Sequence, residues 1–576
     1  MAVLVAACVV MAVAASKALT VRDALTQVIP VAQGIPQKIV AGDTAGASTD
    51  ADAVKSATTR AVDETDSAVW RIAEAVPFAG QNFSAVRIAA EGVDELADFA
   101  VEAAPSLNLQ AFKPSGGAVD LVALHDLSRL VSSGAAVTAG VKDSLGGIDA
   151  AALLPQVSSA VERLNDAVST VDEALSPLAP VLEALPAALG EGGTRTYLLM
   201  FQGNSELRAT GGNPAALALV TATEGRISLT TQATSVQFAN ARPESIAPLD
   251  PETEAIYSDI IGRWIPNMTA TPNFPTTVEI LRAWWADEGL PPFDDVISTD
   301  PVALSYLLEA TGPITLVTGE TLTPENAVPL LLNEVYFAYG EGVDSTAQDV
   351  FFAAAAAQIF STLIGGVDDP LAFADGLTRA TDEGRLKIWS SNPDLEGMLA
   401  GTKLAGTLPA DNADRTVAGV YFNDTTGAKT DYYADATVAA TSDQCTASGP
   451  PTFQQTIEFA NNITPEQAAG LPYFITGPHF EPGYLATDVV VYAPVGASIE
   501  SWTVEGAESY RLRTEGTHLG RSVVRINVIT PPQTAATITV TMKGAEGTTG
   551  ADYGPYDVWT TPMVRETPVT LETPGC

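Results

Sequence analysis

The sequence predicts an α+β protein of several domains, with an N-terminal helical bundle or stalk, a central layered α/β domain and a C-terminal immunoglobulin-like β-sandwich. Apolar residues recur at helical spacing up to about Gly193, and strand-like and helix-like runs alternate after it. Beyond about Arg415, short strand-like runs alternate with Gly, Pro and Asn clusters. Because 576 residues exceed what one core organises, we expect four segments, at 1–16, 17–192, 193–415 and 416–576.

The first segment, M-A-V-L-V-A-A-C-V-V-M-A-V-A-A-S, is an apolar run without a basic start. It is shorter than the roughly 20 residues of a comfortable membrane span. One interpretation is a signal peptide cut near Ser16. The other, which we prefer, is a membrane anchor whose upstream basic residues are missing from this reading frame. Under both, we expect the bulk of the chain to be extracytoplasmic, and under the preferred one a single N-terminal anchor holds it at the cell membrane.

A heptad seam marks the end of the helical region. Its apolar positions alternate spacings of four and three, and they are Val157, Val161, Leu164, Val168, Val171, Leu175, Leu178, Leu182, Leu185 and Leu189. Three prolines, at 177, 180 and 186, interrupt the later half, and each costs about 3 kcal/mol in a helix interior. An intramolecular bundle or stalk is therefore expected, with a dimeric coiled coil as the alternative. Helix breaks are expected at Pro30, Pro77, Pro105, Pro114 and Gly146–Gly147.

The central segment alternates strand and helix. Phe293–Thr299 is expected as a strand, and Asp300 followed by Pro301 starts a helix that ends at Thr311-Gly-Pro. Ile314–Val317 returns as a strand. Thr323-Pro324 starts a second helix that runs to about Tyr339.

The C-terminal segment is expected to be all β. The strand-like runs are Val417–Phe422, Asp431–Ala440, Phe453–Phe459, Val489–Tyr492, Val523–Ile529 and Thr537–Met542. Cys445 and Cys576 are the only cysteines outside the leader, which holds Cys8. In an exported protein they are expected to pair, and two free thiols are the alternative.

Composition limits the classes of function. The formal charge of -40 and the pI near 4.2 repel phosphate backbones, so nucleic acid is not an expected partner. The hydrophobic content of 46% argues against a disordered acidic protein. The sequence has no zinc spacing, P-loop or nucleophile elbow. Its histidines, at 125, 479 and 518, are too scattered to form a ligand cluster or a catalytic triad in the central segment. The acid doublets Asp294–Asp295 and Asp368–Asp369 are interpreted as surface coat, with a cation site as the alternative.

The stretch F-Q-G-N-S-E-L-R-A-T-G-G, residues 201–212, lies between two apolar runs that predict a buried hairpin. A tight turn needs only the glycines, so Glu206 and Arg208 require another explanation. We interpret them as a partly buried ion pair that fixes the turn, with a ligand pocket as the second hypothesis. Gly211 and Gly212 are expected to relieve a backbone at positive φ.

This stretch, together with Asn273-Phe-Pro, Leu386-Lys-Ile-Trp-Ser and Gly419-Val-Tyr-Phe-Asn-Asp, resembles the domain of unknown function family four thousand and twelve. The resemblance covers most of the chain from about Arg195 onward. It implies a single-pass envelope protein of a Gram-positive bacterium, associated with surface polysaccharide, and it implies no reaction.

Phe293-Asp-Asp-Val-Ile-Ser through Leu307-Leu-Glu-Ala-Thr-Gly-Pro-Ile also resembles, more distantly, the LytR-CpsA-Psr ligases, which transfer glycopolymers from polyprenyl pyrophosphate to the cell wall. That resemblance implies an α/β core of their type, several arginines and a magnesium ion around the pyrophosphate. Glu206 and Arg208 would then border the pocket. Further arginines available to it are Arg195, Arg226, Arg242 and Arg263.

The charge pattern opposes that chemistry. Between Arg282 and Arg379 there is no Lys or Arg, whereas Asp and Glu number fifteen. Gln348 and Asp349 stand where a basic residue is wanted. We therefore expect a non-catalytic envelope protein that assembles, retains or binds cell-surface polysaccharide, with no confident cofactor. The alternative is a phosphotransferase-type glycopolymer ligase that acts on polyprenyl-linked glycan with Mg²⁺.

Overall fold

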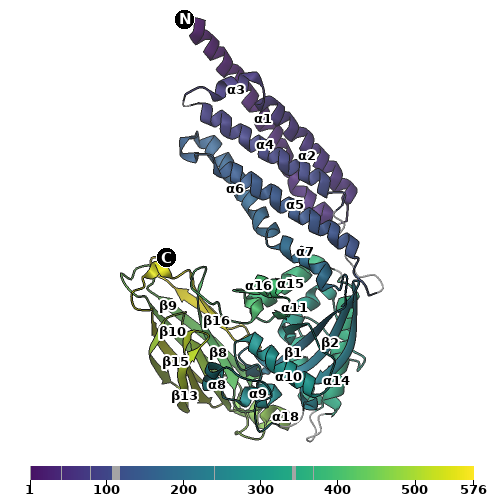
Figure 1. The fold of residues 1–576 in the computed structure, drawn as a ribbon, viewed down its shortest axis with the longest axis vertical. Coiled ribbons are helices and arrows are strands. Elements are labelled where there is room, and N and C mark those ends of the chain that lie inside the picture. Colours follow the sequence, from purple (N-terminus) through teal and green to yellow (C-terminus); the bar gives the residue numbers. More distant parts are fainter. Residues whose placement is uncertain are drawn as a thin grey trace. The chain divides into compact units, whose positions relative to one another are not determined.

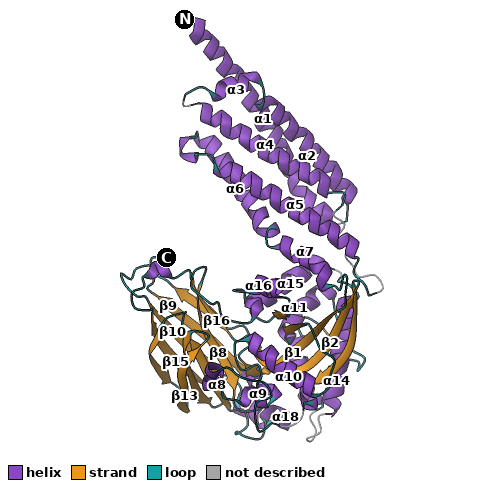
Figure 2. Ribbon diagram, viewed as in Figure 1, coloured by secondary structure: helices purple, strands orange, loops and turns teal. Residues whose placement is uncertain are grey.

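The computed structural model describes residues 2–40, 42–77, 79–106, 117–238, 241–339, 346–367 and 369–576. The chain forms two compact units: a helical unit, Met1–Gly193 with Thr223–Arg226, and a mixed unit, Thr194–Ala222 with Ile227–Cys576. Helices fill the first, and helices and sheets build the second (Figure 2). The predicted α+β architecture, with N-terminal helices and C-terminal sheets, is confirmed. The predicted break at Pro114 and the acid Asp368 lie outside the described residues.

Long helices that lie side by side form the helical unit (Figure 1). They are α1 (Ala2–Val40), α2 (Thr44–Thr65), α3 (Ala68–Glu74), α4 (Gly80–Ala103), α5 (Leu121–Gly146), α6 (Pro155–Leu175) and α7 (Leu178–Ala188). The break predicted at Pro30 is wrong, because α1 continues through it to Val40. Within the described residues, no helix has both the length and the apolar character needed to cross a membrane.

The heptad seam packs inside its own chain. Val161 and Val168 of α6 are buried in one cluster with Val141 and Leu145 of α5. The loss of burial begins before Pro177, since Val171 is 45% exposed and Leu178 is 49% exposed. Leu182, Leu185 and Leu189 are half-buried again, so the prolines do not end the seam.

The mixed unit begins with a five-stranded sheet of order β3-β2-β1-β4-β7, in which β1 pairs parallel with β4 and antiparallel with β2, and β4 pairs antiparallel with β7. Its strands are β1 (Arg195–Arg208), β2 (Gly211–Thr223), β3 (Arg226–Thr234), β4 (Asp295–Thr299) and β7 (Lys387–Ser390). The helices of this part are α8 (Pro251–Tyr257), α9 (Ile260–Arg263), α10 (Phe274–Asp287), α11 (Pro301–Thr311), α12 (Ala327–Pro329), α13 (Val335–Ala338), α14 (Thr346–Ile364), α15 (Pro370–Asp382) and α16 (Pro393–Leu399). Leu198 and Met200 of β1 share a core with Trp284 and Trp285 of α10.

The helix start at Asp300 is confirmed, since its carboxylate accepts the Ala303 N–H at 2.8 Å and α11 begins at Pro301. The helix ends at Gly312, whose φ of 72° favours glycine. The start predicted at Thr323-Pro324 is wrong. Thr323 and Asn326 exchange side-chain hydrogen bonds and close a turn. Helix begins only at Ala327 and passes through a π-helical stretch, Leu330–Glu334, before α13.

Two further five-stranded sheets, which we call the C-terminal sheet pair, follow in the orders β12-β15-β10-β9-β17 and β13-β14-β11-β8-β16. Their strands are β8 (Thr416–Asp424), β9 (Ala434–Ser442), β10 (Thr452–Asn461), β11 (Leu485–Tyr492), β12 (Ser498–Glu505), β13 (Ser509–His518), β14 (Arg521–Thr530), β15 (Thr534–Lys543), β16 (Tyr556–Thr560) and β17 (Val569–Glu572). A small ladder, β5 (Ile314–Thr315) with β6 (Thr321–Leu322), and two short helices, α17 (Pro465–Ala469) and α18 (Tyr473–Thr476), complete the unit. Cys445 and Cys576 form a disulfide with a Cα separation of 5.4 Å, so the predicted pairing is present.

Every residue of β8 and of β11 is buried. On one side their apolar residues, such as Phe422 and Val489, pack against the other sheet of the pair. On the opposite side Tyr421 and Tyr492 join the core of α10 and β1. A strand covered on both faces reads as a continuous apolar run rather than an alternating one. The end of β8 is thereby held against the end of β1, where the charged stretch lies.

Candidate functional site

The charged stretch belongs to β1 itself. β1 and β2 pair antiparallel through Arg208↔Gly211, so the connecting turn is Ala209–Thr210. A register shift between Gly203 and Leu207 leaves Glu206 in the irregular part of the strand. The hairpin is present as predicted, with its strands longer than the apolar runs indicated.

The two glycines have different roles. Gly211 has a φ of +140°, a conformation that side chains rarely adopt. Gly212 is absent from the positive-φ positions, so that expectation is wrong for it. A Cβ there would lie 2.2 Å from the carbonyl oxygen of Gly203. Close backbone approach therefore requires this glycine.

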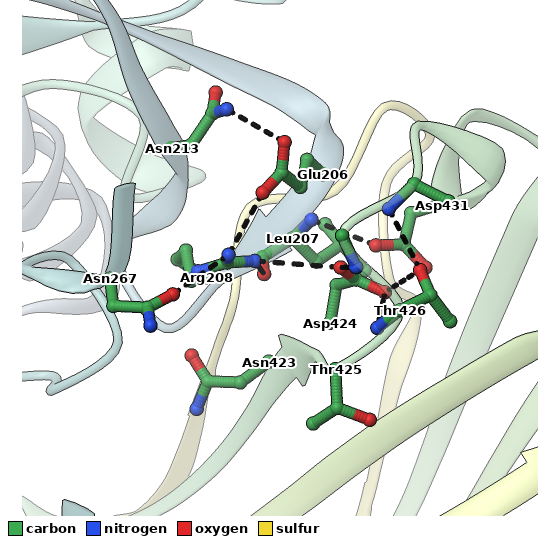
Figure 3. Close-up of polar contacts among 12 residues, drawn as sticks. Glu206, Leu207, Arg208, Asn213, Asn267, Asn423, Asp424, Thr425, Thr426 and Asp431 are labelled. Carbon is green, nitrogen blue, oxygen red and sulfur yellow. Dashed lines mark hydrogen bonds and ion pairs between the residues drawn. The ribbon is translucent and has the colours of Figure 1, made fainter. Parts of the chain in front are cut away.

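Glu206 and Arg208 form an ion pair, with 2.9 Å between Arg208 Nη2 and Glu206 Oε1 (Figure 3). Their side chains are 7% and 3% exposed, so the pair is fully buried rather than partly. Arg208 also donates to Asn267 Oδ1 at 3.0 Å and to the Leu207 carbonyl at 2.7 Å, and its Nη1 lies 3.8 Å from Asp424. Asn213 donates to the second Glu206 oxygen at 2.8 Å. The guanidinium is thus surrounded by acceptors from the chain.

The β1 end is fastened to the loop that follows β8. Lys429 Nζ lies 3.5 Å from Glu206, and the Leu207 N–H donates to Asp431 Oδ2 at 2.8 Å. The Ala209 N–H donates to Asn423 Oδ1 at 3.0 Å. Sequence reasoning missed these partners, because more than 200 residues separate Leu207 from Asp431.

The cluster holds three carboxyl groups, of Glu206, Asp424 and Asp431, and two cations, of Arg208 and Lys429. Burial raises the pKa of Asp424 to about 6, although Arg208 acts against this shift. Burial and the neighbouring Asp424 raise the pKa of Asp431 well above its ordinary value. Asp431 Oδ1 is buried without a hydrogen-bond partner. Burial and the neighbouring Asp424 therefore both disfavour the charged form of Asp431.

The other arginines named from the sequence do not join this cluster in the described contacts. Arg195 makes a bidentate pair with Asp295, at 2.7 and 2.8 Å, and Arg226 groups with the helical unit. Arg242 pairs with Asp287, and Arg263 lies 3.5 Å from Asp259.

The interpretation of Asp294–Asp295 as surface coat is wrong. Asp295 is 3% exposed and holds Arg195, while Asp294 accepts the Thr196 N–H at 2.9 Å. Both carboxylates fix the start of β1 against β4, which a count of charges along the sequence does not reveal.

A second buried network was not predicted. Arg385 donates to Asp300 at 3.0 Å and to the Met563 carbonyl at 2.8 Å. Asn204 donates to the same Asp300 oxygen at 2.9 Å. Burial lowers the pKa of the nearby Lys387 to about 7. Asp300, recognised only as a helix cap, thus also holds an arginine.

A polar cavity of about 330 Å³, which we call the Arg208 pocket, borders the first cluster. Its walls include Arg208, Asn267 and Asn423, and also Trp264, which is 39% exposed. Asn423 is 4% exposed, and its Nδ2 is buried with no hydrogen-bond partner. In Figure 3 no dashed line reaches this nitrogen.

An apolar cavity of about 270 Å³ lies on the other side of the β1 end. Leucines and alanines of α11, the π-helical stretch and α14 contribute part of its wall. Lys429, Gln202 and Asn213 are among its polar lining residues. Among the described residues, no group of three His, Cys, Asp or Glu side chains is placed to hold a metal ion.

Residues 192–336 match the family model described as Protein of unknown function (DUF4012). The match confirms the family resemblance inferred from the charged stretch. It includes Glu206, Arg208 and Asn267, whereas Asn423 and Asp431 lie outside it. No curated protein and no solved structure matches the chain significantly.

Proposed function

Because residues 192–336 belong to this family of unknown function, we propose that the chain is an exported, membrane-tethered envelope protein that assembles, retains or binds cell-surface polysaccharide without catalysing a reaction. In this proposal the C-terminal sheet pair is an immunoglobulin-like sandwich, and the sheet around β1 is a relative of the LytR-CpsA-Psr core. The N-terminal segment supplies the tether and the mixed unit meets the glycan.

One observation carries the non-catalytic part of the proposal: the two buried arginines nearest the β1 end, Arg208 and Arg385, already have carboxylate partners. Arg208 pairs with Glu206 and Arg385 pairs with Asp300, each at 3.0 Å or less and with side-chain exposure of 7% or less. A clamp for a pyrophosphate needs several guanidinium groups whose charge is not already balanced. Withdrawing one partner from a buried pair costs about 3–5 kcal/mol, which a ligand would have to supply.

The Asp300 and Asp424 carboxylates near these arginines do not fit a magnesium ion, which the alternative activity implies. Asp300 accepts from Ala303, Asn204 and Arg385, and Asp424 accepts from the backbone N–H groups of Thr426 and Gly427. Mg²⁺ needs carboxylate oxygens that are free to bind it in octahedral geometry. These oxygens are held by donors of the chain instead.

The apolar cavity supports the alternative, a transferase that acts on polyprenyl-linked glycan. It could hold a hydrocarbon chain, with Lys429 near the polar end. Lys429 is 22% exposed and already lies 3.5 Å from Glu206, so it offers a pyrophosphate little uncompensated charge. The cavity therefore suits the binding of a lipid chain, but it does not supply the charge that transfer from a pyrophosphate needs.

The test uses the full chain and surface polysaccharide extracted from the bacterium that produces it. We expect the protein to co-sediment saturably with the polymer. In a parallel reaction with the lipid-linked polymer, wall fragments and Mg²⁺, we expect no transfer. Failure to co-sediment would contradict the binding role, and repeated turnover of polymer onto wall fragments would establish the ligase instead.

A further inference from the structure

We propose that the Arg208 pocket binds one neutral sugar ring, with Trp264 as its stacking surface and Asn423 as a hydrogen-bond donor to a hydroxyl oxygen. This inference rests on the proposed function and assigns it a place on the molecule. The pocket combines segments far apart in sequence, from the α9 region, the loop after β8, and the strands β11 and β14.

The charges of the pocket wall balance one another. Arg208 lies between Glu206 and Asp424, and Arg525 Nε donates to Asp488 at 2.8 Å. Asp488 is fully buried and also accepts from Asn527 at 2.9 Å. A charged ligand would find no uncompensated partner here, which selects a neutral one.

The unused polar group in the wall is a donor. Asn423 Oδ1 accepts the Ala209 N–H, which fixes the orientation of the amide, and Nδ2 of this lining residue is left without a partner. A buried N–H without a partner costs free energy, and a ligand oxygen would recover it. The Asn267 amide is oriented in a similar way, because its Oδ1 accepts from Arg208. A ligand rich in hydroxyl oxygens meets this need.

The apolar part of the wall suits one face of a ring. Trp264 presents an exposed indole, and Ile260 and Ile261 lie beside it in the lining. A sugar ring has a C–H face that can stack on an indole and a rim of hydroxyls that can meet amides. The volume of about 330 Å³ is near the lower limit of small-molecule sites, which fits one ring rather than an oligosaccharide.

The experiment measures saturation-transfer NMR of the full chain with glucose, galactose, mannose, rhamnose, arabinose and N-acetylglucosamine, with glycerol as the polyol control. We expect at least one sugar to bind saturably while glycerol does not. Trp264→Ala should lower the affinity for that sugar at least about tenfold, which is the loss expected when one good contact is removed. Phe337→Ala removes another exposed aromatic side chain, which lies outside the pocket lining, and this variant should bind the sugar as the wild type does.

Asn423→Asp gives a second arm, because it keeps an acceptor for Ala209 and removes the donor. This variant should also lower the affinity for the sugar about tenfold or more. Its melting curve is measured to show that the chain is folded. The inference fails if no sugar saturates, or if Trp264→Ala binds as tightly as the wild type. If Trp264→Ala still co-sediments with the polymer like the wild type, the glycan-binding function stands and this pocket is not its site.

Discussion

Removing Arg208 is expected to destabilise the mixed unit strongly. Arg208→Ala deletes the ion pair with Glu206 and the hydrogen bonds to Asn267 and the Leu207 carbonyl. It also leaves two carboxyl groups, of Glu206 and Asp424, in a site whose remaining nearby cation is Lys429. Breaking a buried pair from one side costs about 3–5 kcal/mol. Solvent offers little relief, because the Arg208 side chain is 3% exposed.

A double-mutant cycle separates the lost pair from the lost packing. In Glu206→Ala with Arg208→Ala, the stranded carboxylate is absent, so part of the loss should return, with a coupling of about 1–3 kcal/mol. Recovery stays incomplete because Lys429 also loses its partner. Urea unfolding followed by tryptophan fluorescence measures this, since every tryptophan except Trp70 lies in the mixed unit.

Arg415→Ala is the matched control, because Arg415 pairs with Asp557 but is 56% exposed. Exposed pairs contribute about 0–1 kcal/mol, so this variant should unfold almost as the wild type does. The reasoning is refuted if Arg208→Ala is no less stable than Arg415→Ala. It is also refuted if the double variant loses as much stability as the two single variants added together, because the two residues would then not be coupled.

Cys576→Ser removes the disulfide to Cys445, which closes a loop with a sequence separation of 131. Urea unfolding should show a free energy of unfolding lower by up to about 5 kcal/mol. Equal unfolding curves of the wild type with and without reductant would contradict this. Asp431→Asn should be at least as stable as the wild type at pH 7 and should match it near pH 4. The reason is that the folded-state pKa of Asp431 lies above its unfolded value, so its stabilising contribution is complete at low pH and is lost as the pH rises. If the stability of Asp431→Asn relative to the wild type instead fell as the pH rose from 4 to 7, the raised pKa of Asp431 would be contradicted. Protease added to intact cells that lack a thick wall should digest the chain beyond about Ser16, and protection of the whole chain would contradict export.

Local signals in the sequence predicted local structure well. Asp300-Pro301 gave a helix start because a short side chain caps the N–H groups beside it. Thr323-Pro324 has the same appearance, and Thr323 accepts the Asn326 and Ala327 N–H groups as a cap does, but regular helix begins only at Ala327. The sequence therefore located this helix start to within a turn.

The site depended on contacts that no local pattern encodes. The sequence indicated Glu206 and Arg208 as a pair, and they do form one. Their burial comes from the loop after β8, whose Asp424 and Asp431 lie far along the chain. The sequence singled out Asn423 only as part of the run Gly419-Val-Tyr-Phe-Asn-Asp that carries the family resemblance, although its side chain holds the β1–β2 turn. Tertiary packing places these groups together, so a single sequence could not name them.

The central claim is that the buried charges beside β1 stabilise the fold and are not a phosphate clamp. Calorimetric titration of the full chain with farnesyl pyrophosphate and Mg²⁺ tests it most directly. The account predicts no saturable binding in the wild type, because Arg208 and Arg385 are held by Glu206 and Asp300. Saturable binding that disappears in Arg208→Ala, while that variant melts like the wild type, would contradict it.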